Sequence, residues 1–202
     1  MDKKILLRVW PEFGSTGIWM PPEAGAQLVG PNVSYESLDL PIDLINDFIV
    51  WQDIYSNQKV PEDDTIDWDA FGVTGLELAK RLKIHLFYKA DVEYEWEGIQ
   101  KIYAFKVMAD YDASIWIDNE EAYDLWMIEK EFGNFQFIQR KLFQKKFYEW
   151  EGQFSDCAKI NGGWDKFNQQ GKELVKELQN SLPQNCVVWY KKTFEETYQG
   201  LR

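Results

Sequence analysis

The chain has 202 residues, 45% of them hydrophobic and 16% aromatic, which is enough to bury the core of one large domain or two small ones. Its formal net charge of −12 argues against nucleic-acid binding, because such a surface must be basic to neutralise phosphates. The first residues lack the pattern of a secretory signal, and no stretch approaches the ~20 apolar residues of a membrane span. Cys157 and Cys186 are therefore expected to be reduced thiols of a cytoplasmic protein that binds no membrane.

Hydrophobic periodicity predicts the same order of elements twice along the chain. In the first half we expect strands at 5–10 and 17–19, a helix that begins near Pro41 and runs to Tyr55, a helix at 68–82 and a strand at 91–96. In the second half we expect strands at 103–108 and 114–116, helices at 143–154 and 164–178, and a strand at 186–192. The predicted fold class is α+β, built from two tandem strand–strand–helix–helix–strand units.

Matched residues in the two halves indicate an internal duplication. The segment WDAFGVTGLELAKRL (68–82) returns 96 positions later as WDKFNQQGKELVKEL (164–178). The apolar stripe of the preceding helix also returns, 99 positions later: Leu44, Phe48, Trp51 and Tyr55 correspond to Phe143, Phe147, Trp150 and Phe154. We predict an acidic first domain at 1–97 and a second domain at 98–202, with the boundary near EGIQK (97–101).

The shared aromatic residues are expected to form the core of each copy, because they recur at helical or strand spacing and no basic residues interleave with them. Gly75 and Gly171 occupy matched positions inside helices, where glycine costs ~1 kcal/mol relative to alanine. Their repetition predicts the close approach of another backbone.

Candidate catalytic and metal-binding residues are sparse. His85 is the single histidine and is expected near a helix end, and the spacing of the two cysteines fits no zinc site. No serine stands in a G-x-S-x-G context, and no glycine-rich loop carries the lysine of a phosphate-binding site. Of the acids shared by the copies, Asp69/Asp165 is expected in the first turn of a helix, where a carboxylate suits the helix dipole, and Glu77/Glu173 is expected to be solvated. We therefore expect no catalytic, cofactor or metal site, although the many carboxylates leave a paired-carboxylate hydrolase open.

The two copies differ most in charge. Residues 1–97 contain 8 basic and 18 acidic residues, whereas residues 98–202 contain 14 and 16, so the fold does not require the acidity of the first copy. Further acids on the first predicted helix, Asp43 and Asp47, have Leu142 and Lys146 as counterparts. We predict an anionic docking surface that attracts a cationic partner, with Trp126 or Trp189 as a candidate apolar anchor. Its predicted residues are Glu62, Asp63, Asp64, Asp67, Glu93, Glu95, Glu97, Asp118, Glu120 and Glu121.

The segments YESLDLPIDLINDFIVW and DTIDWDAFGVTGLELAKRLK resemble a pattern found in small bacterial proteins. In that pattern, a tryptophan-bearing strand precedes an L-x-L-P helix ending in F-x-x-W, and an acidic W-D-x-F-x-x-x-G-x-x-L-A helix and a final strand follow. SIWIDNEEAYDLW and WDKFNQQGKELVKEL look like the same pattern again, although the second copy lacks the Leu-Pro before its helix. Proteins of this kind are similar to immunity proteins of bacterial polymorphic toxin systems, including contact-dependent growth inhibition.

The resemblance implies a cytosolic, non-catalytic antitoxin that binds and occludes a cognate toxin domain, often a basic nuclease. The acidic surface of the first copy agrees with this hypothesis, because its carboxylates can mimic the phosphates of such a toxin's substrate. An adaptor or structural protein with a non-toxin partner is the alternative, and an enzyme is the third possibility.

Overall fold

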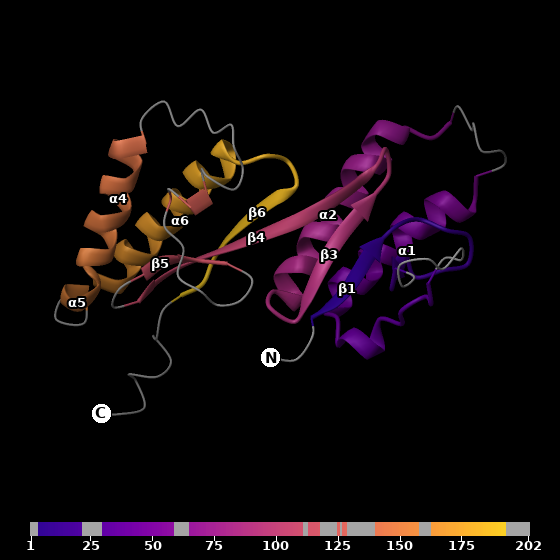
Figure 1. The fold of residues 1–202 in the computed structure, drawn as a ribbon, viewed down its shortest axis with the longest axis horizontal. Helices are drawn as coiled ribbons and strands as arrows, with labels where there is room; N and C mark the ends of the chain where they lie inside the picture. The colour runs from indigo at the N-terminus through magenta and orange to yellow at the C-terminus, as the bar shows by residue number, and fades with distance from the viewer. Residues whose placement is uncertain are drawn as a thin grey trace. The chain divides into compact units, whose positions relative to one another are not determined.

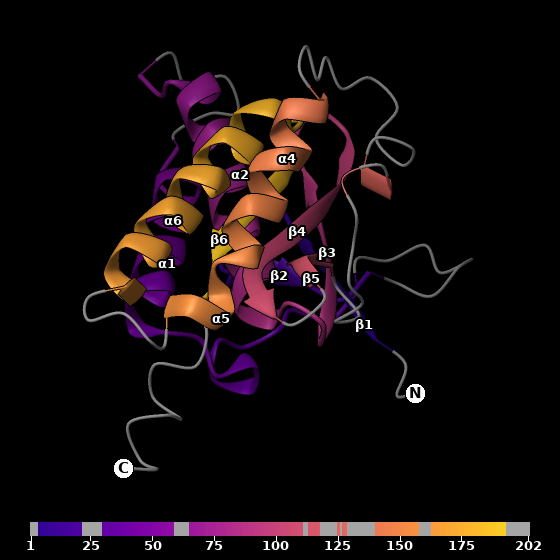
Figure 2. The same cartoon turned by 90° about the vertical axis from the view of Figure 1, so that its left-hand side faces the viewer.

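The computed structural model describes residues 4–21, 30–58, 65–110, 113–117, 125, 127–128, 140–157 and 163–192. The chain divides into two compact units, Met1–Tyr103 (unit 1) and Ala104–Arg202 (unit 2). Each unit combines strands with helices (Figures 1 and 2), so the predicted α+β class is confirmed.

Unit 1 contains the strands and helices predicted for the first half, with one short 3-10 helix (η1) added before the first α-helix. These elements are β1 (Ile5–Val9), β2 (Ile18–Trp19), η1 (Glu36–Leu38), α1 (Ile42–Ser56), α2 (Trp68–Leu86) and β3 (Ala90–Glu95). α1 begins directly after Pro41, where the missing backbone N–H of proline removes no helical hydrogen bond.

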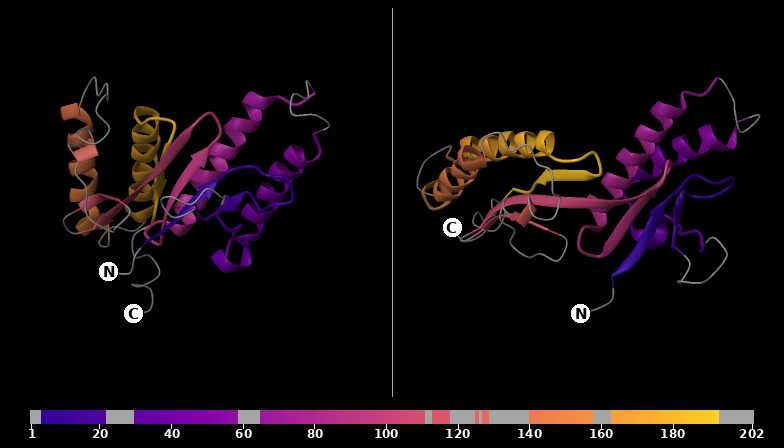
Figure 3. Two further views of the ribbon diagram at one scale, coloured as in Figure 1. Left: turned by 45° about the vertical axis from the view of Figure 1, so that its right-hand side comes forward. Right: turned by 45° about the horizontal axis from the view of Figure 1, so that its top comes forward.

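β1 pairs with a strand on each of its two sides. It pairs antiparallel with β2, with Arg8 opposite Trp19, and parallel with β3, with Arg8 opposite Glu93. A parallel pair needs a crossover connection, which α1 and α2 supply on one side of the strands (Figure 3). β3 then turns at Gly98, whose φ of 145° favours glycine, and pairs antiparallel with the start of β4 (Ile99–Asp110).

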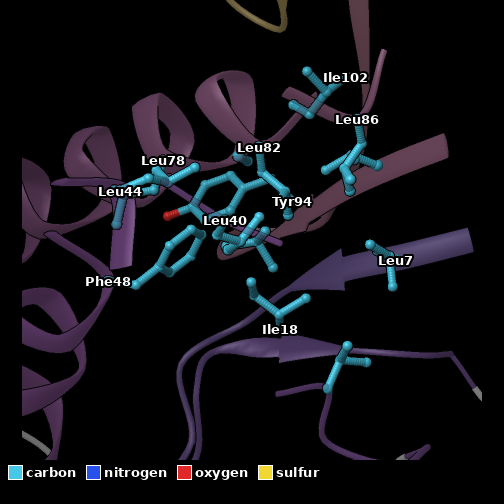
Figure 4. Packing of buried hydrophobic residues seen from close by; sticks show 14 of the residues in the cluster. Leu7, Ile18, Leu40, Leu44, Phe48, Leu78, Leu82, Leu86, Tyr94 and Ile102 are labelled. Atoms are coloured by element: carbon cyan, nitrogen blue, oxygen red, sulfur yellow. The ribbon is translucent and has the colours of Figure 1, made fainter. Parts of the chain in front are cut away.

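The core of unit 1 lies between its two helices and its strands. Figure 4 shows Leu44 and Phe48 of α1, Leu78 and Leu82 of α2 and Tyr94 of β3 gathered in this layer. Burying one such apolar side chain contributes ~1.5–3 kcal/mol, so the periodic positions hold the layers together. The prediction that the shared residues are core residues is confirmed for this unit, although Trp68 and Tyr55 are only partly buried.

Unit 2 has the elements predicted for the second half. They are the second part of β4, β5 (Ala113–Trp116), α4 (Arg140–Gly152), the single turn α5 (Phe154–Cys157), α6 (Gly163–Ser181) and β6 (Cys186–Tyr190). β4 pairs antiparallel with β5, with Lys106 opposite Trp116, and also pairs with β6. The predicted stripe again lies in the core, since Phe143, Phe147 and Trp150 are buried, although Phe154 is only partly buried.

The same tryptophan contact occurs in both units. In unit 1 the indole Nε1 of Trp51 donates to the carbonyl oxygen of Phe71 (3.1 Å), and the two rings stack with centroids 4.9 Å apart. In unit 2 the indole Nε1 of Trp150 donates to the carbonyl oxygen of Phe167 (2.9 Å), and the stacked rings are 4.8 Å apart. Each bond satisfies a buried indole N–H, which would otherwise be costly.

Aromatic rings also explain the two helical glycines. A Cβ on Gly75 would lie 2.6 Å from Cζ2 of Trp51 and 2.7 Å from the hydroxyl oxygen of Tyr94. A Cβ on Gly171 would lie 2.4 Å from Cε2 of Tyr190 and 2.7 Å from Cζ2 of Trp150. The close approach is therefore made by side chains, and the prediction of a neighbouring backbone is wrong.

The division between the units falls after Tyr103, a few residues beyond the predicted boundary at 97/98. Residues 99–102 pair with residues 92–95 of β3, and this hairpin keeps them with unit 1. The boundary was expected near EGIQK, and part of that segment belongs to the continuous strand Ile99–Asp110.

Candidate partner-binding surface

Four of the ten predicted docking carboxylates lie within the described part of the chain. These are Asp67, Glu93, Glu95 and Glu97. The remaining six, Glu62, Asp63, Asp64, Asp118, Glu120 and Glu121, lie outside the described residues, as does Trp126.

Glu93 and Glu95 are paired with an arginine of the neighbouring strand. Arg8 Nη2 lies 2.9 Å from Glu93 Oε2, and Arg8 Nη1 lies 2.8 Å from Glu95 Oε2. Lys101 of β4 stands directly opposite Glu93 in the antiparallel register. The outward face of β3 therefore carries charges of both signs, because each glutamate forms an ion pair with Arg8. This face is less anionic than the sequence suggested.

Asp67 and Glu97 lie at neighbouring ends of α2 and β3. Asp67 is the N-cap of α2, and its carboxylate accepts a hydrogen bond from the backbone N–H of Ala70 (2.9 Å), which explains the aspartate structurally. Glu97 is exposed in the turn after β3. Trp68 and Trp96 stack with centroids 5.8 Å apart, so the two carboxylates flank one aromatic contact.

Glu97 also acts on a buried tyrosine. Burial raises the pKa of Tyr94, and the negative charge of Glu97 raises it further. The Tyr94 hydroxyl donates to the carbonyl oxygen of Gly72 (2.7 Å), which requires the protonated form. This hydroxyl is a structural donor in the core and is unsuited to proton transfer at neutral pH.

The outer face of α1 combines aspartates with aliphatic residues. Asp43 Oδ2 lies 3.0 Å from Arg81 Nη2 of α2, and Asp47 forms an ion pair with the same guanidinium. Between and beside these aspartates stand four exposed β-branched residues: Ile42, Ile49, Val50 and Ile54. Sequence reasoning considered only the aspartates here, although the apolar residues at i, i+7, i+8 and i+12 were a readable signal of a second apolar face.

The corresponding helix of unit 2 has a different surface. Lys146 of α4, which matches Asp47, donates to Glu177 of α6, which matches Arg81, with Nζ 2.7 Å from Oε2. The exposed helix surface of unit 2 also carries Glu149, whose carboxylate lies 3.4 Å from Lys145. The two units thus hold equivalent helices together with ion pairs of opposite polarity.

A fully buried lysine was missed by sequence reasoning. Lys83 in the last turn of α2 donates from Nζ to the carbonyl oxygens of Phe87 (3.0 Å) and Ala90 (2.6 Å), and the Asp91 carboxylate lies 3.8 Å away. In unit 2 the matched Gln179 donates from Nε2 to the carbonyl oxygen of Cys186 (3.0 Å). Because a neutral amide makes the same contact, we assign Lys83 to tying the helix end to the next strand.

The remaining candidate groups are placed as follows. His85 lies in the last turn of α2, as predicted, with Nε2 3.4 Å from the carbonyl oxygen of Leu38. Cys157 and Cys186 are buried free thiols. Burial raises the pKa of the Cys157 thiol, and the negative charge of Asp156 raises it further. Within the described ranges, no group of three or more His, Cys, Asp or Glu residues is placed to hold a metal ion. No helix among those residues is long and apolar enough to cross a membrane.

Comparison with known proteins gives no relative: no family model, no curated protein and no solved structure matches this chain.

Proposed function

We propose that the chain is a tandem duplication of one α+β domain and that it acts as a cytoplasmic, non-catalytic immunity protein. In this proposal it binds a cognate bacterial toxin domain, a cationic nuclease, and covers its substrate-binding surface. The acidic first unit supplies the docking surface, and the second unit supports it.

Matched contacts support the duplication. The Trp51–Phe71 and Trp150–Phe167 pairs share a hydrogen bond and a ring stack, with both partners shifted by nearly the same number of positions. Strand registers match too: Arg8 stands opposite Trp19 in unit 1, as Lys106 stands opposite Trp116 in unit 2. Unrelated domains have no physical reason to repeat these pairs in the same chain order.

The observation that carries the proposed function is the unequal number of surplus acidic residues in the two units. Residues 1–97 carry a surplus of ten acidic residues and residues 98–202 a surplus of two. Like charges on one surface oppose compactness, so an acidity that the fold does not need suggests selection for a partner. A cationic nuclease is such a partner, because its phosphate-binding surface attracts carboxylates and associates quickly with them.

Co-expression tests this function directly. The chain would be tagged and purified from its native cell, and any stoichiometric basic protein, including products of neighbouring genes, would be expressed alone and together with it. We expect the partner to stop growth when expressed alone and to become harmless when the chain is present. A partner that is harmless alone would contradict the antitoxin function.

An adaptor with a non-toxin partner is the second candidate. The ion pairs of Arg8 with Glu93 and Glu95 favour it, because they reduce the free negative charge on the predicted docking strand. A stable complex that changes no toxic activity would identify an adaptor.

A further inference from the structure

We propose that the outer face of α1 is the docking surface of this protein, and that it receives an amphipathic basic segment of a partner protein. The surface consists of the aliphatic residues Ile42, Ile49, Val50 and Ile54 together with the carboxylates of Asp43, Asp47 and Asp53. This inference deepens the proposed function and rests on it for the partner being a protein.

The four aliphatic residues are largely exposed. Their exposed fractions are 71% for Ile42, 44% for Ile49, 60% for Val50 and 42% for Ile54. The opposite face of α1 carries Leu44, Phe48 and Trp51, which are buried in the core. α1 is therefore apolar on two faces, whereas a helix that meets only its own core is apolar on one.

Unit 2 supplies an internal comparison at matched positions. In α4 the residues that correspond to Ile42, Val50 and Ile54 are Lys141, Glu149 and Gln153. Tyr148 takes the place of Ile49 and is exposed, and Leu142 takes the place of Asp43. The fold thus accepts polar residues at three of these four positions, so the aliphatic residues of α1 are not required for folding. Their retention in the acidic unit indicates contact with a partner.

Charge identifies the chemistry of the occupant. Three aspartates are interleaved with the aliphatic residues, and the single positive charge of Arg81 pairs with two of them, Asp43 and Asp47. The surface therefore keeps a net negative charge around an apolar centre. An amphipathic helix with leucine on one side and lysine or arginine along its edges matches both features. An anionic membrane surface would be repelled by the same aspartates.

A peptide titration with the full chain tests this inference. The probe is a synthetic 14-residue amphipathic helix of leucine and lysine, and its control is a scrambled peptide of the same composition. We expect saturable binding of the helical peptide, followed by fluorescence anisotropy, with NMR shift changes gathered at residues 42–54. Val50→Glu together with Ile54→Gln, the residues of unit 2 at these positions, should weaken binding by at least about tenfold.

Matched variants separate docking from loss of folding. Tyr148→Ala removes the exposed ring of α4 that corresponds to Ile49, and we expect it to leave peptide affinity unchanged. Should the double variant unfold, Ile42→Lys at the first position of α1 takes its place, because this side chain is the most exposed of the four.

Three results would overturn the inference. They are equal binding of the scrambled peptide, an equal loss of affinity in the Tyr148 variant, and concentration-dependent self-association that the α1 variant abolishes, which would make a second copy the occupant. The titration needs no toxin, so its failure overturns this surface alone. Failure of the growth-rescue test overturns the proposed antitoxin alone.

Discussion

Lys146 on α4 and Glu177 on α6 form an ion pair whose polarity is the reverse of the one between Asp47 on α1 and Arg81 on α2. Each residue of one pair matches a residue of the other at the spacing of the sequence repeat. Both helix pairs therefore carry an ion pair at corresponding sequence positions, with opposite signs of charge on the two helices.

The Lys146–Glu177 pair should show measurable coupling. We expect Lys146→Glu and Glu177→Lys each to lower the free energy of unfolding, because each places two like charges together. The double variant should recover most of the loss, with a coupling energy of ~0.2–1 kcal/mol, as for other surface pairs. Urea unfolding of the four proteins measures it, and strictly additive effects would show that the pair contributes nothing.

Alanine at either helical glycine should destabilise the chain. A Cβ at Gly75 or Gly171 would lie less than 3 Å from aromatic atoms, so a buried ring must move. We expect a loss of ~1–3 kcal/mol from overpacking, partly offset by the ~1 kcal/mol gain in helix propensity. Thermal unfolding of each variant measures the difference.

Gly152 provides the control for this prediction. It lies at the end of α4, and a Cβ there would meet nothing within 4 Å. Gly152→Ala should therefore be neutral or slightly stabilising. A loss of stability similar to that of Gly75→Ala would show that ring contact does not explain the glycines.

Reversal of Glu93 and Glu95 to lysine should destabilise unit 1. Both carboxylates hold Arg8, and the double variant would place two lysines beside that guanidinium and close to Lys101. We expect a lower melting temperature by circular dichroism, whereas Glu97→Lys in the exposed turn should leave it nearly unchanged. Equal melting temperatures for all three proteins would show that the Arg8 contacts do not stabilise the strands.

Tyrosine burial predicts a loss of stability at alkaline pH. Burial raises the pKa of Tyr35 to about 12 from 10.0 in the unfolded chain, with further contributions from Asp53 and Glu36. Between these values the unfolded chain releases a proton that the folded chain retains, so the stabilisation present below pH 10 is lost as the pH rises toward 12. Tyr35→Phe should show a shallower decline in the free energy of unfolding over this range.

The Tyr35 variant also loses a hydrogen bond to the carbonyl oxygen of Thr16 (2.8 Å), so its stability at neutral pH should fall by ~1 kcal/mol. Urea unfolding at several pH values separates this constant loss from the change in slope. An unchanged slope would assign the alkaline decline to other groups.

Periodicity predicted most of the helices and strands, with η1 and the first residues of β4 as exceptions. The stripe from Leu44 to Tyr55 and the repeated segment at 68–82 both became helices that bury the expected faces. The strand at 91–96 was predicted correctly because buried residues alternate along it. Such patterns are local, and each element can be read within a window of a dozen residues.

The candidate site was harder to predict, because its chemistry depends on pairs that are distant in sequence. Arg8 and Glu93 are 85 positions apart and meet only because β1 and β3 pair in parallel. Arg81 reaches Asp43 and Asp47 across two packed helices. A count of acidic residues treats these carboxylates as free charges, whereas in the structure each of them forms an ion pair with an arginine.

The sequence by itself determined the order of the elements, the residues of the core and the unequal charge of the two halves, because periodicity and composition are properties of the chain. The tertiary structure decided which carboxylates are compensated and which apolar side chains remain exposed. The exposed aliphatic residues of α1, which no count of charges reveals, are the reason for the docking surface that we propose there. Charge compensation and burial depend on neighbours in space, and these neighbours exist only once the strands and helices have packed.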